Sequence, residues 1–513
     1  MGHLSKRLSA AALVLAFGML SMPWNAFASE IRVGFIQDAL TLDPANPGDR
    51  NTEVIIRNMY DGLVTRDPAM KVVPQLAQSW RQIDPVTYEF KLRPGLHFHD
   101  GAPLTAQDVK FTLDRVLTGK IGGQTNPRRD LLGPLKRVEI VDPLTIRLVL
   151  SAPWPVLPAM LPFEEIVSEA FVKKNGDQAL VEEEDGAGPF RLAQWDRGDT
   201  IVMDRVPDYY GGSPDIAPVG PAHVDRVIYK IMPNDAARVS ALLAGDVDIV
   251  SSLPVTSIRR VEADPDTQVE TVNSTRTFFV AINNAKPPFN DVRVRQALNY
   301  AVDRKLIVAK LLDGLATPLN GVLSPDAFGF DPDLPDYAYD PAKARALLAE
   351  AGVHDLQLTI DTDGANKGVA EAIASLMSKS GITAKVQVWE SAVLVPIWRS
   401  AAKRKDHDLL LTSWGNATLE PSDIMMPTVR SGGRGNSAGY SNPAVDKLLD
   451  AAETEQDPGK RKALYVKVQE QVHADAPWIF LWLPRDVYGV SKRVHDWKPR
   501  PDGMIDLSRA SVE

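Results

Sequence analysis

Residues 90–115 read FKLRPGLHFHDGAPLTAQDVKFTLDR, and this stretch shows how the chain alternates between strand and helix. It predicts a strand, a tight turn at Pro94-Gly95, a second short strand and another turn at Asp100-Gly101. A helix should follow, because Thr105 and Asp108 have the spacing of a capping box. The apolar residues of that helix are Val109, Phe111, Leu113 and Val116.

The same alternation continues along the chain. Strands are predicted at residues 31–35, 87–92, 145–150, 201–205, 226–231, 277–282, 356–360, 384–388 and 409–411. Helices are predicted after Asn290-Asp291 and Asp340-Pro341, and over residues 443–452 and 460–472. Because the segments have no fixed period, the sequence predicts α/β layers and not a repeat array.

The stretch at 90–115 resembles the signature of the bacterial extracellular solute-binding proteins of family 5. These are the peptide-, nickel- and opine-type receptors of ABC importers. Gly186-Ala187-Gly188-Pro189-Phe190 resembles a second family motif, with alanine where threonine is usual. Further segments match in the same order: residues 41–44, 60–63, 73–80, 288–298, 440–443 and 445–446. Several motifs in one order are more specific than any single motif.

The resemblance implies an α/β fold of the two-lobed periplasmic binding protein type, with a hinge and a ligand held between the lobes. Lobe I would comprise residues 29–273, with an extra subdomain at about 51–184. Lobe II would comprise residues 274–486, and residues 487–513 would return to lobe I. The lobes of such proteins close around their ligand by a hinge motion.

The first 28 residues have the features of a secretory signal peptide. Lys6 and Arg7 precede a short apolar run, and Ala26-Phe27-Ala28 provides a small-x-small cleavage pattern. We expect cleavage after Ala28 and a soluble mature protein in a bacterial periplasm. The chain has no cysteine, so neither a disulfide nor a lipid-modified N-terminal cysteine is expected.

Charge and composition exclude several classes of partner. The net charge is −9, and loss of the leader removes two further positive charges, which argues against nucleic acid. His97 and His99 are two residues apart on a predicted strand, but no third ligand for a zinc ion lies nearby. The acidic run at 182–185 is expected to be a solvated loop. We predict no cofactor and no metal, and a metal-chelate carrier remains an alternative.

The segment Gly435-Asn436-Ser437-Ala438-Gly439 spells the G-x-S-x-G motif of a hydrolase nucleophile elbow. An elbow needs a strand before the serine and a helix directly after it. A glycine loop precedes Ser437 here, and the next helix begins only after Asn442-Pro443. A ligand-binding loop is therefore the better interpretation, with Arg434 offering donors to a carboxylate or phosphate. A secreted serine hydrolase that uses Ser437 remains the rival.

The residues after Trp414 bear on the ligand. Peptide-type members of the family usually carry an aspartate soon after this tryptophan, which holds the α-ammonium of the ligand. The matching position here is Asn416, a neutral amide. Asp423 or Glu420 could substitute, but neither lies at the matching spacing. An amide makes no charge-assisted bond to an ammonium group, so a polar or anionic ligand fits better than a simple dipeptide. Opine-like conjugates, modified peptides such as glutathione, and glycosyl-phosphate compounds all remain open.

Other candidate ligand residues follow predicted strands. Gln37, Asp38 and Thr41 follow the first strand, Arg276 lies beside the predicted hinge, and Trp389 follows the strand ending at Val388. The predicted ligand-binding set is therefore Asn416, Arg434, Arg276, Trp414, Trp389, Gln37, Asp38 and Thr41, with no catalytic residue. The expected function is that of a monomeric periplasmic binding protein, which delivers a small polar or peptide-like solute to the permease subunits of an ABC importer.

Overall fold

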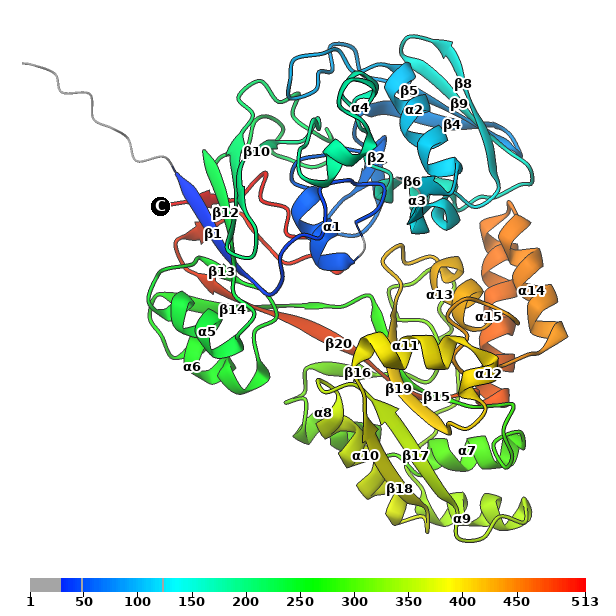
Figure 1. Ribbon diagram of the computed structural model, residues 1–513. Helices are drawn as coiled ribbons and strands as arrows, with labels where there is room; N and C mark the ends of the chain where they lie inside the picture. The colour runs from blue at the N-terminus through cyan, green and yellow to red at the C-terminus, as the bar shows by residue number, and fades with distance from the viewer. Residues whose placement is uncertain (1–28, 48, 122–123) are drawn as a thin grey trace, which may run out of the picture.

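The computed structural model describes residues 29–47, 49–121 and 124–513. The predicted leader, residues 1–28, lies outside the described residues. A twelve-stranded sheet runs through two lobes that lie on either side of a central cleft (Figure 1). None of the helices in the described ranges has both the length and the apolar composition that a membrane crossing requires.

Lobe I contains one half of this sheet, and the short helices α5 and α6 pack on it. The strands, in spatial order, are β10 (Phe190–Asp196), β11 (Thr200–Arg205), β12 (Arg226–Ile231), β1 (Glu30–Phe35) and β13 (Ile249–Val250). The helices are α1 (Arg50–Ile56), α5 (Asp235–Leu243) and α6 (Ile258–Glu262). Since β1 runs parallel to both β12 and β13, the first strand lies in the interior of the sheet.

Lobe II contains the other half of the sheet, covered by helices on both faces. Its strands are β15 (Arg276–Ile282), β16 (Ala316–Pro318), β17 (Gln357–Thr362), β18 (Thr383–Val388) and β19 (Leu409–Gly415). Its helices are α7 (Val292–Tyr300), α8 (Arg304–Lys310), α9 (Pro341–Glu350), α10 (Lys367–Ser378), α11 (Ser391–Arg399), α12 (Ala401–Arg404), α13 (Pro421–Thr428), α14 (Pro443–Thr454) and α15 (Pro458–Asp475). Separate apolar cores lie on the two faces of these strands.

Two long strands connect the lobes. β14 (Thr267–Asn273) pairs antiparallel with β20 (Trp478–Ser491), and only Ser274-Thr275 separates β14 from β15. β20 pairs with β15 through Trp482 and with β14 from Arg485 onward, so a single strand runs from one lobe into the other (Figure 1). The domain boundaries at 273 and 486 stay predictions, although both fall in this pair of connecting strands.

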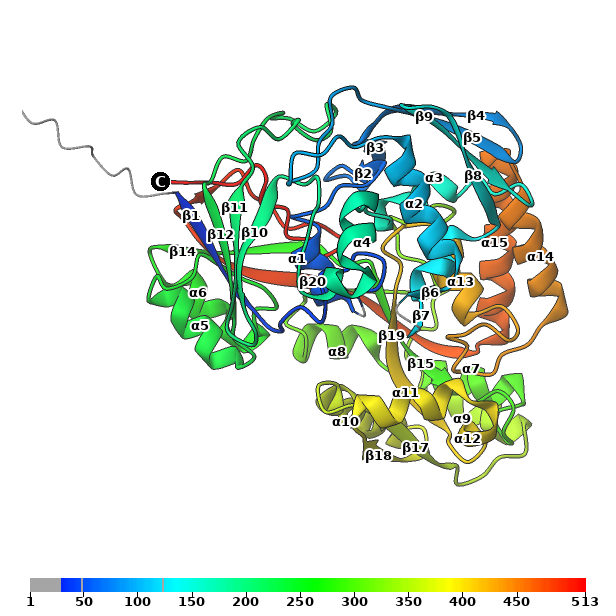
Figure 2. The same ribbon diagram turned by 45° about the horizontal axis from the view of Figure 1, so that its top comes forward.

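The subdomain is a small α/β unit with a core of its own. Its four-stranded sheet has the order β4 (Ala77–Asp84), β5 (Thr87–Leu92), β9 (Thr145–Leu150) and β8 (Leu135–Asp142). Shorter elements are β2 (Val64–Arg66), β3 (Val72–Pro74), β6 (Lys120–Ile121), β7 (Gln124–Thr125), α2 (Ala106–Leu117), α3 (Leu157–Met160) and α4 (Glu169–Asn175). Figure 2 shows this unit beside α14 and α15 of lobe II.

The quoted stretch at 90–115 folds largely as predicted. Thr105 caps α2, and both bonds of the capping box are present. Val109, Leu113 and Val116 of α2 are fully buried in the subdomain core. The second short strand was a wrong prediction, because this segment forms only an isolated bridge between His97 and Pro103.

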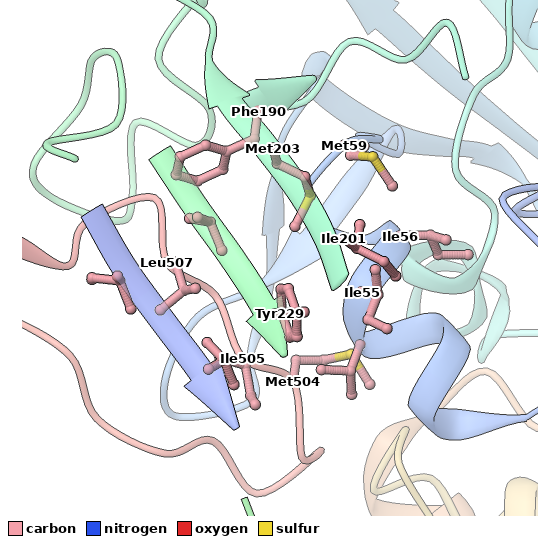
Figure 3. Close-up of a cluster of buried hydrophobic side chains, with 14 of the residues drawn as sticks. Ile55, Ile56, Met59, Phe190, Ile201, Met203, Tyr229, Met504, Ile505 and Leu507 are labelled. Atoms are coloured by element: carbon pink, nitrogen blue, oxygen red, sulfur yellow. The ribbon is translucent and has the colours of Figure 1, made fainter. Parts of the chain in front are cut away.

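The C-terminal segment completes the core of lobe I. After β20 the chain forms β21 (Val494–His495) and β22 (Ser511–Val512), and Met504, Ile505 and Leu507 pack against α1 and the sheet (Figure 3). Arg500 and Asp502 form a bidentate ion pair in this segment, with N–O distances of 3.1 and 2.8 Å. Both side chains are more than nine-tenths buried.

Asp61 lies in lobe I in a buried cluster of neutral donors. It accepts hydrogen bonds from the Tyr209 hydroxyl at 2.8 Å and from the Tyr210 hydroxyl and Gln75 Nε2 at 2.6 Å. Burial raises the pKa of this carboxyl from 3.8 to about 7, against the lowering effect of the tyrosine bonds. The proton is therefore held more tightly in the folded state than in the unfolded state.

We expect Asp61→Asn to flatten the pH dependence of stability. Because the folded pKa is raised, wild-type protein should lose stability as pH rises from about 4 to 7, at about 1.4 kcal/mol per pH unit. The variant lacks the titrating proton and should not show this loss. Urea unfolding at pH 5 and pH 7 measures both slopes. Parallel slopes for the two proteins would mean that Asp61 titrates normally.

Candidate ligand-binding cleft

Two adjoining cavities lie between the lobes. The first, of about 370 Å³, is bordered by α1 of lobe I and by β19, α11 and the loop at 429–442 of lobe II, and we call it the arginine cavity. The second, of about 550 Å³, lies beside the connecting strands and the C-terminal segment, and we call it the hinge cavity. Arg50, Arg276 and Gly415 line both cavities, which therefore form one continuous cleft.

Four guanidinium groups line the arginine cavity, and each comes from a different element. Arg50 is the first residue of α1, Arg276 begins β15, Arg399 ends α11, and Arg434 lies in the loop after α13. Arg276 donates to Ser413 Oγ at 3.2 Å. Arg434 lies over the Trp414 ring at 5.1 Å and reaches Asp130 only at 4.0 Å. Within the described ranges, neither Arg276 nor Arg399 has an acidic partner within 4.0 Å.

The like charges of these groups disfavour one another. Arg276 is exposed to the cleft, yet the surrounding protein lowers the pKa of its guanidinium, and the charge of Arg50 adds to this effect. Burial also lowers the pKa of Arg399, and Arg434 contributes in the same direction. The cleft therefore holds two pairs of mutually repelling cations, Arg50 with Arg276 and Arg399 with Arg434. An anionic ligand would relieve this repulsion.

Two acids, Asp363 and Asp423, line the arginine cavity against its four arginines, and Asp486 and Asp502 line the hinge cavity. Burial raises the pKa of Asp486 to about 6, although Ser274, Arg276 and Arg50 act against it. Burial likewise raises the pKa of Asp423, whose carboxylate accepts from Thr418 N–H at 3.2 Å and Thr418 Oγ1 at 3.1 Å. Burial thus makes the charged form of both carboxyls less favourable than that of an exposed aspartate.

The glycine loop packs closely on Trp414. The indole Nε1 donates to the Asp423 carbonyl at 3.1 Å, which holds the ring in place. A side chain at residue 435 would collide with the ring, so only glycine permits this approach. Ser437 lines the arginine cavity, but α13 precedes its loop and α14 follows it. The strand that a nucleophile elbow requires is not found before Ser437 in the described structure.

Asn416 lies beneath the cavity and is not among its lining residues. It is 2% exposed, and its backbone N–H donates to the Thr275 carbonyl at 2.9 Å. Its side-chain oxygen accepts from Thr418 Oγ1 at 3.3 Å, while its Nδ2 has no partner in the described structure. Asp423 lines the cavity instead. The predicted ligand role of Asn416 therefore gains no support from its position.

Four other predicted ligand residues lie outside the lining of both cavities. Trp389 donates to Asp361 Oδ1 at 2.9 Å, and Gln37 donates to Asp49 Oδ2 at 2.7 Å. Asp38 accepts from Trp195 Nε1 at 3.0 Å, and Thr41 Oγ1 accepts from the Asp43 N–H at 3.1 Å. These side chains are satisfied by partners within their own lobes. The structure brings together Arg276, Trp414 and Arg434 from the predicted set.

The cleft contains two residues that the sequence did not single out, Arg50 and Arg399, together with Asp423, which the sequence offered only as a substitute for the missing aspartate. Arg50 follows an aspartate that caps α1, and Arg399 ends an amphipathic helix, so local patterns explain both as ordinary helix residues. Only the folded chain brings them to the same cavity.

The histidine and acidic segments pair with each other. His99 Nδ1 lies 2.8 Å from Glu184 Oε2, and its Nε2 lies 3.0 Å from the Gly188 carbonyl. Burial lowers the pKa of His99, but Glu184 outweighs this effect and raises it. The expectation of a solvated loop at 182–185 is thus wrong for Glu184 and Asp185, which are buried. No group of three or more metal-ligating side chains was found among the residues described.

Comparisons with known proteins agree with this architecture. The model of the bacterial extracellular solute-binding proteins, family 5, matches residues 71–436. The glutathione-binding protein GsiB of Pectobacterium atrosepticum is 27% identical over 99% of this chain and 99% of its own length. The structure of the ABC transporter substrate-binding protein CtaP of Listeria monocytogenes has a TM-score of 0.86 at 24% identity, with 94% of this chain and 99% of that one covered.

A second solved structure is similar at a slightly higher identity. The periplasmic binding protein DppA of Helicobacter pylori, in complex with the peptide STSA, has a TM-score of 0.80 at 25% identity. It covers 95% of this chain and 99% of its own. The family model matches more than half of this chain, and the lobes, the connecting strands and the cleft have the arrangement that the family implies. The chain belongs to the bacterial extracellular solute-binding proteins of family 5 and is a substrate-binding protein of an ABC importer.

Proposed function

We propose that this protein binds an anionic, peptide-like solute in the arginine cavity and delivers it to the permease subunits of its importer. It acts as a monomer in the periplasm and catalyses no reaction. One observation carries the proposal: Arg276 and Arg399 face the cavity without an acidic partner among the described residues, and Arg50 and Arg434 stand beside them. Uncompensated guanidinium groups in a cleft are suited to carboxylates, which they bind in a bidentate manner.

The relatives support a ligand of this class. GsiB proteins are named for glutathione, a tripeptide with two carboxylates and one ammonium group. Its carboxylates suit two separate arginine pairs, and Asp423 lines the same cavity. We therefore place glutathione and acidic peptides ahead of neutral dipeptides. The hydrolase alternative lacks the strand before Ser437 in the described ranges. The metal-chelate carrier stays an alternative, because a chelate brings its own metal ligands.

The first test is native mass spectrometry of protein purified gently from the periplasm. A discrete added mass that disappears on unfolding is the expected result, and its value identifies the solute class. A thermal-shift panel then compares glutathione and acidic dipeptides with neutral dipeptides. At 100 times Kd a ligand should stabilise the folded state by about 2.7 kcal/mol. Stabilisation by neutral dipeptides alone would contradict the proposal.

Arg434→Ala should weaken binding of the anionic solute by more than about tenfold, because it removes one charge-assisted contact. Stability of the ligand-free protein should change little, since the Arg434 side chain is 56% exposed. Arg430→Ala is the matched control, because Arg430 belongs to the same loop but pairs with Asp450 at 2.9 Å. Isothermal titration calorimetry measures both. Equal Kd values for the two variants would remove Arg434 from the site.

A further inference from the structure

A third cavity, of about 640 Å³, lies between the subdomain and lobe II, and we call it the subdomain cavity. Its walls differ from those of the arginine cavity, because most of its large side chains are apolar. The subdomain contributes Leu131, Pro134, Trp154 and Met160, and α13 contributes Met426 and Pro427. Apolar walls in a cleft favour an apolar occupant, since burial removes its surface from water.

The subdomain cavity adjoins the arginine cavity. Asp423 and Arg434 line both of them and therefore mark the boundary between the two. Arg434 also lies 4.0 Å from Asp130 of the subdomain, across this boundary. A molecule held by the arginines can thus extend past these two residues and place its far end between the subdomain and α13.

Hydrogen bonds hold the walls of the subdomain cavity in place. Trp154 Nε1 of the subdomain donates to Glu453 Oε2 of α14 at 2.9 Å. Glu453 also accepts from the Tyr465 hydroxyl at 3.2 Å and from Ser422 Oγ. Gly133 lies directly against the Trp154 ring and leaves no room for a side chain there. The cavity is therefore preformed, which lowers the entropic cost of occupying it.

We propose that the subdomain cavity is a second binding subsite, which takes an aliphatic or aromatic group of the same solute whose anionic part lies among the arginines. The subdomain thereby contributes to solute selection. This inference rests on the proposed function, and it specifies a solute with carboxylates at one end and an apolar group at the other.

Because the chain has no cysteine, a single introduced thiol can test the subsite directly. Met426→Cys places a thiol in the wall of the subdomain cavity, and Ala346→Cys places one on the exposed surface of α9. Each variant is equilibrated with the disulfides of 2-phenylethanethiol and 2-mercaptoethanol. Mass spectrometry should show a preference for the phenylethyl adduct that is about tenfold greater at 426 than at 346. Equal preferences would overturn the subsite.

A second variant and a second readout keep the test independent of folding and of ligand identity. Leu131→Cys probes the opposite wall and should give the same preference if Met426→Cys does not fold. S-hexylglutathione should then slow the phenylethyl exchange at 426 at least about tenfold more than glutathione does at equal occupancy. Equal protection would mean that the hexyl group lies elsewhere. If neither glutathione nor S-hexylglutathione binds, the proposal of a glutathione-like ligand is contradicted. The subsite is then still tested by the preference for the phenylethyl adduct at 426 over 346.

Discussion

Arg276→Ala should weaken binding of the anionic solute by about 30-fold or more, which corresponds to about 2 kcal/mol. Arg276 lines both the arginine cavity and the hinge cavity, and only Ser413 accepts a hydrogen bond from its guanidinium within the described structure. A carboxylate of the solute would therefore be its main partner. Calorimetric titration with the solute identified by mass spectrometry measures the change in Kd.

Two comparisons make this result specific. Arg276→Lys keeps the charge but not the planar fork, so it should recover only part of the lost affinity. Arg345→Ala serves as a surface control, because Arg345 is exposed on α9 and donates to the Lys379 carbonyl at 2.6 Å. Stability of the ligand-free Arg276→Ala protein should change little, because the repulsion from Arg50 and the attraction to Asp486 are lost together. Unchanged affinity in Arg276→Ala would place the solute elsewhere.

Asp502→Ala should destabilise the protein by about 3–5 kcal/mol, because it leaves the Arg500 guanidinium buried without its carboxylate. The pair holds the C-terminal segment against α1, and Arg500 also donates to the Arg66 carbonyl at 3.0 Å. Glu139→Ala is the control, because the Arg137–Glu139 pair is largely exposed and should contribute less than about 1 kcal/mol. Urea unfolding compares the two, and similar losses would contradict the prediction.

The same ion pair has a pH signature opposite in sign to that of Asp61. Burial disfavours the charged form of Asp502, but Arg500 outweighs it and holds the pKa of the carboxyl well below its usual range. Stability from this pair should therefore be complete above about pH 4 and be lost as pH falls further. Asp502→Ala should show less acid-induced loss than wild type, which unfolding midpoints at pH 5 and pH 3 can determine.

Local chemistry made most of the fold predictable. In strands such as 145–150 and 226–231, apolar residues alternate with polar ones or stand together. The helices begin after capping residues such as Asp291 and Asn442. Each of these elements is therefore specified within its own segment. β20 was missed as a strand, because its apolar run WIFLWLPRDVYGV contains a proline, which is unusual in the interior of a sheet. Its length becomes clear only from its partners β14 and β15.

The cleft was less predictable, for a physical reason. A single sequence shows which residues end a strand, but not which of these ends point into the cleft. Gln37 and Asp38 follow β1 as a ligand residue would, yet Asp49 and Trp195 bind their side chains. Arg50 and Arg399 lie almost 350 positions apart and meet only through the packing of α1 and α11 around one cavity. Long-range convergence of this kind has no local pattern.

β20 also limits how the two lobes can move. It pairs with β15 from Trp478 to Trp482, with β16 from Trp482 to Pro484 and with β14 from Arg485 to Ser491, so bending is confined to the step from Pro484 to Arg485, where the partners change. Two adjacent strands that are fixed in a sheet at both ends bend easily about one axis only. Twisting them would strain the hydrogen bonds of both ladders. Opening should therefore follow a single angular coordinate. If two pairs of labels across the lobes are measured in the same single molecules, the distance of one pair should then be a fixed function of the distance of the other.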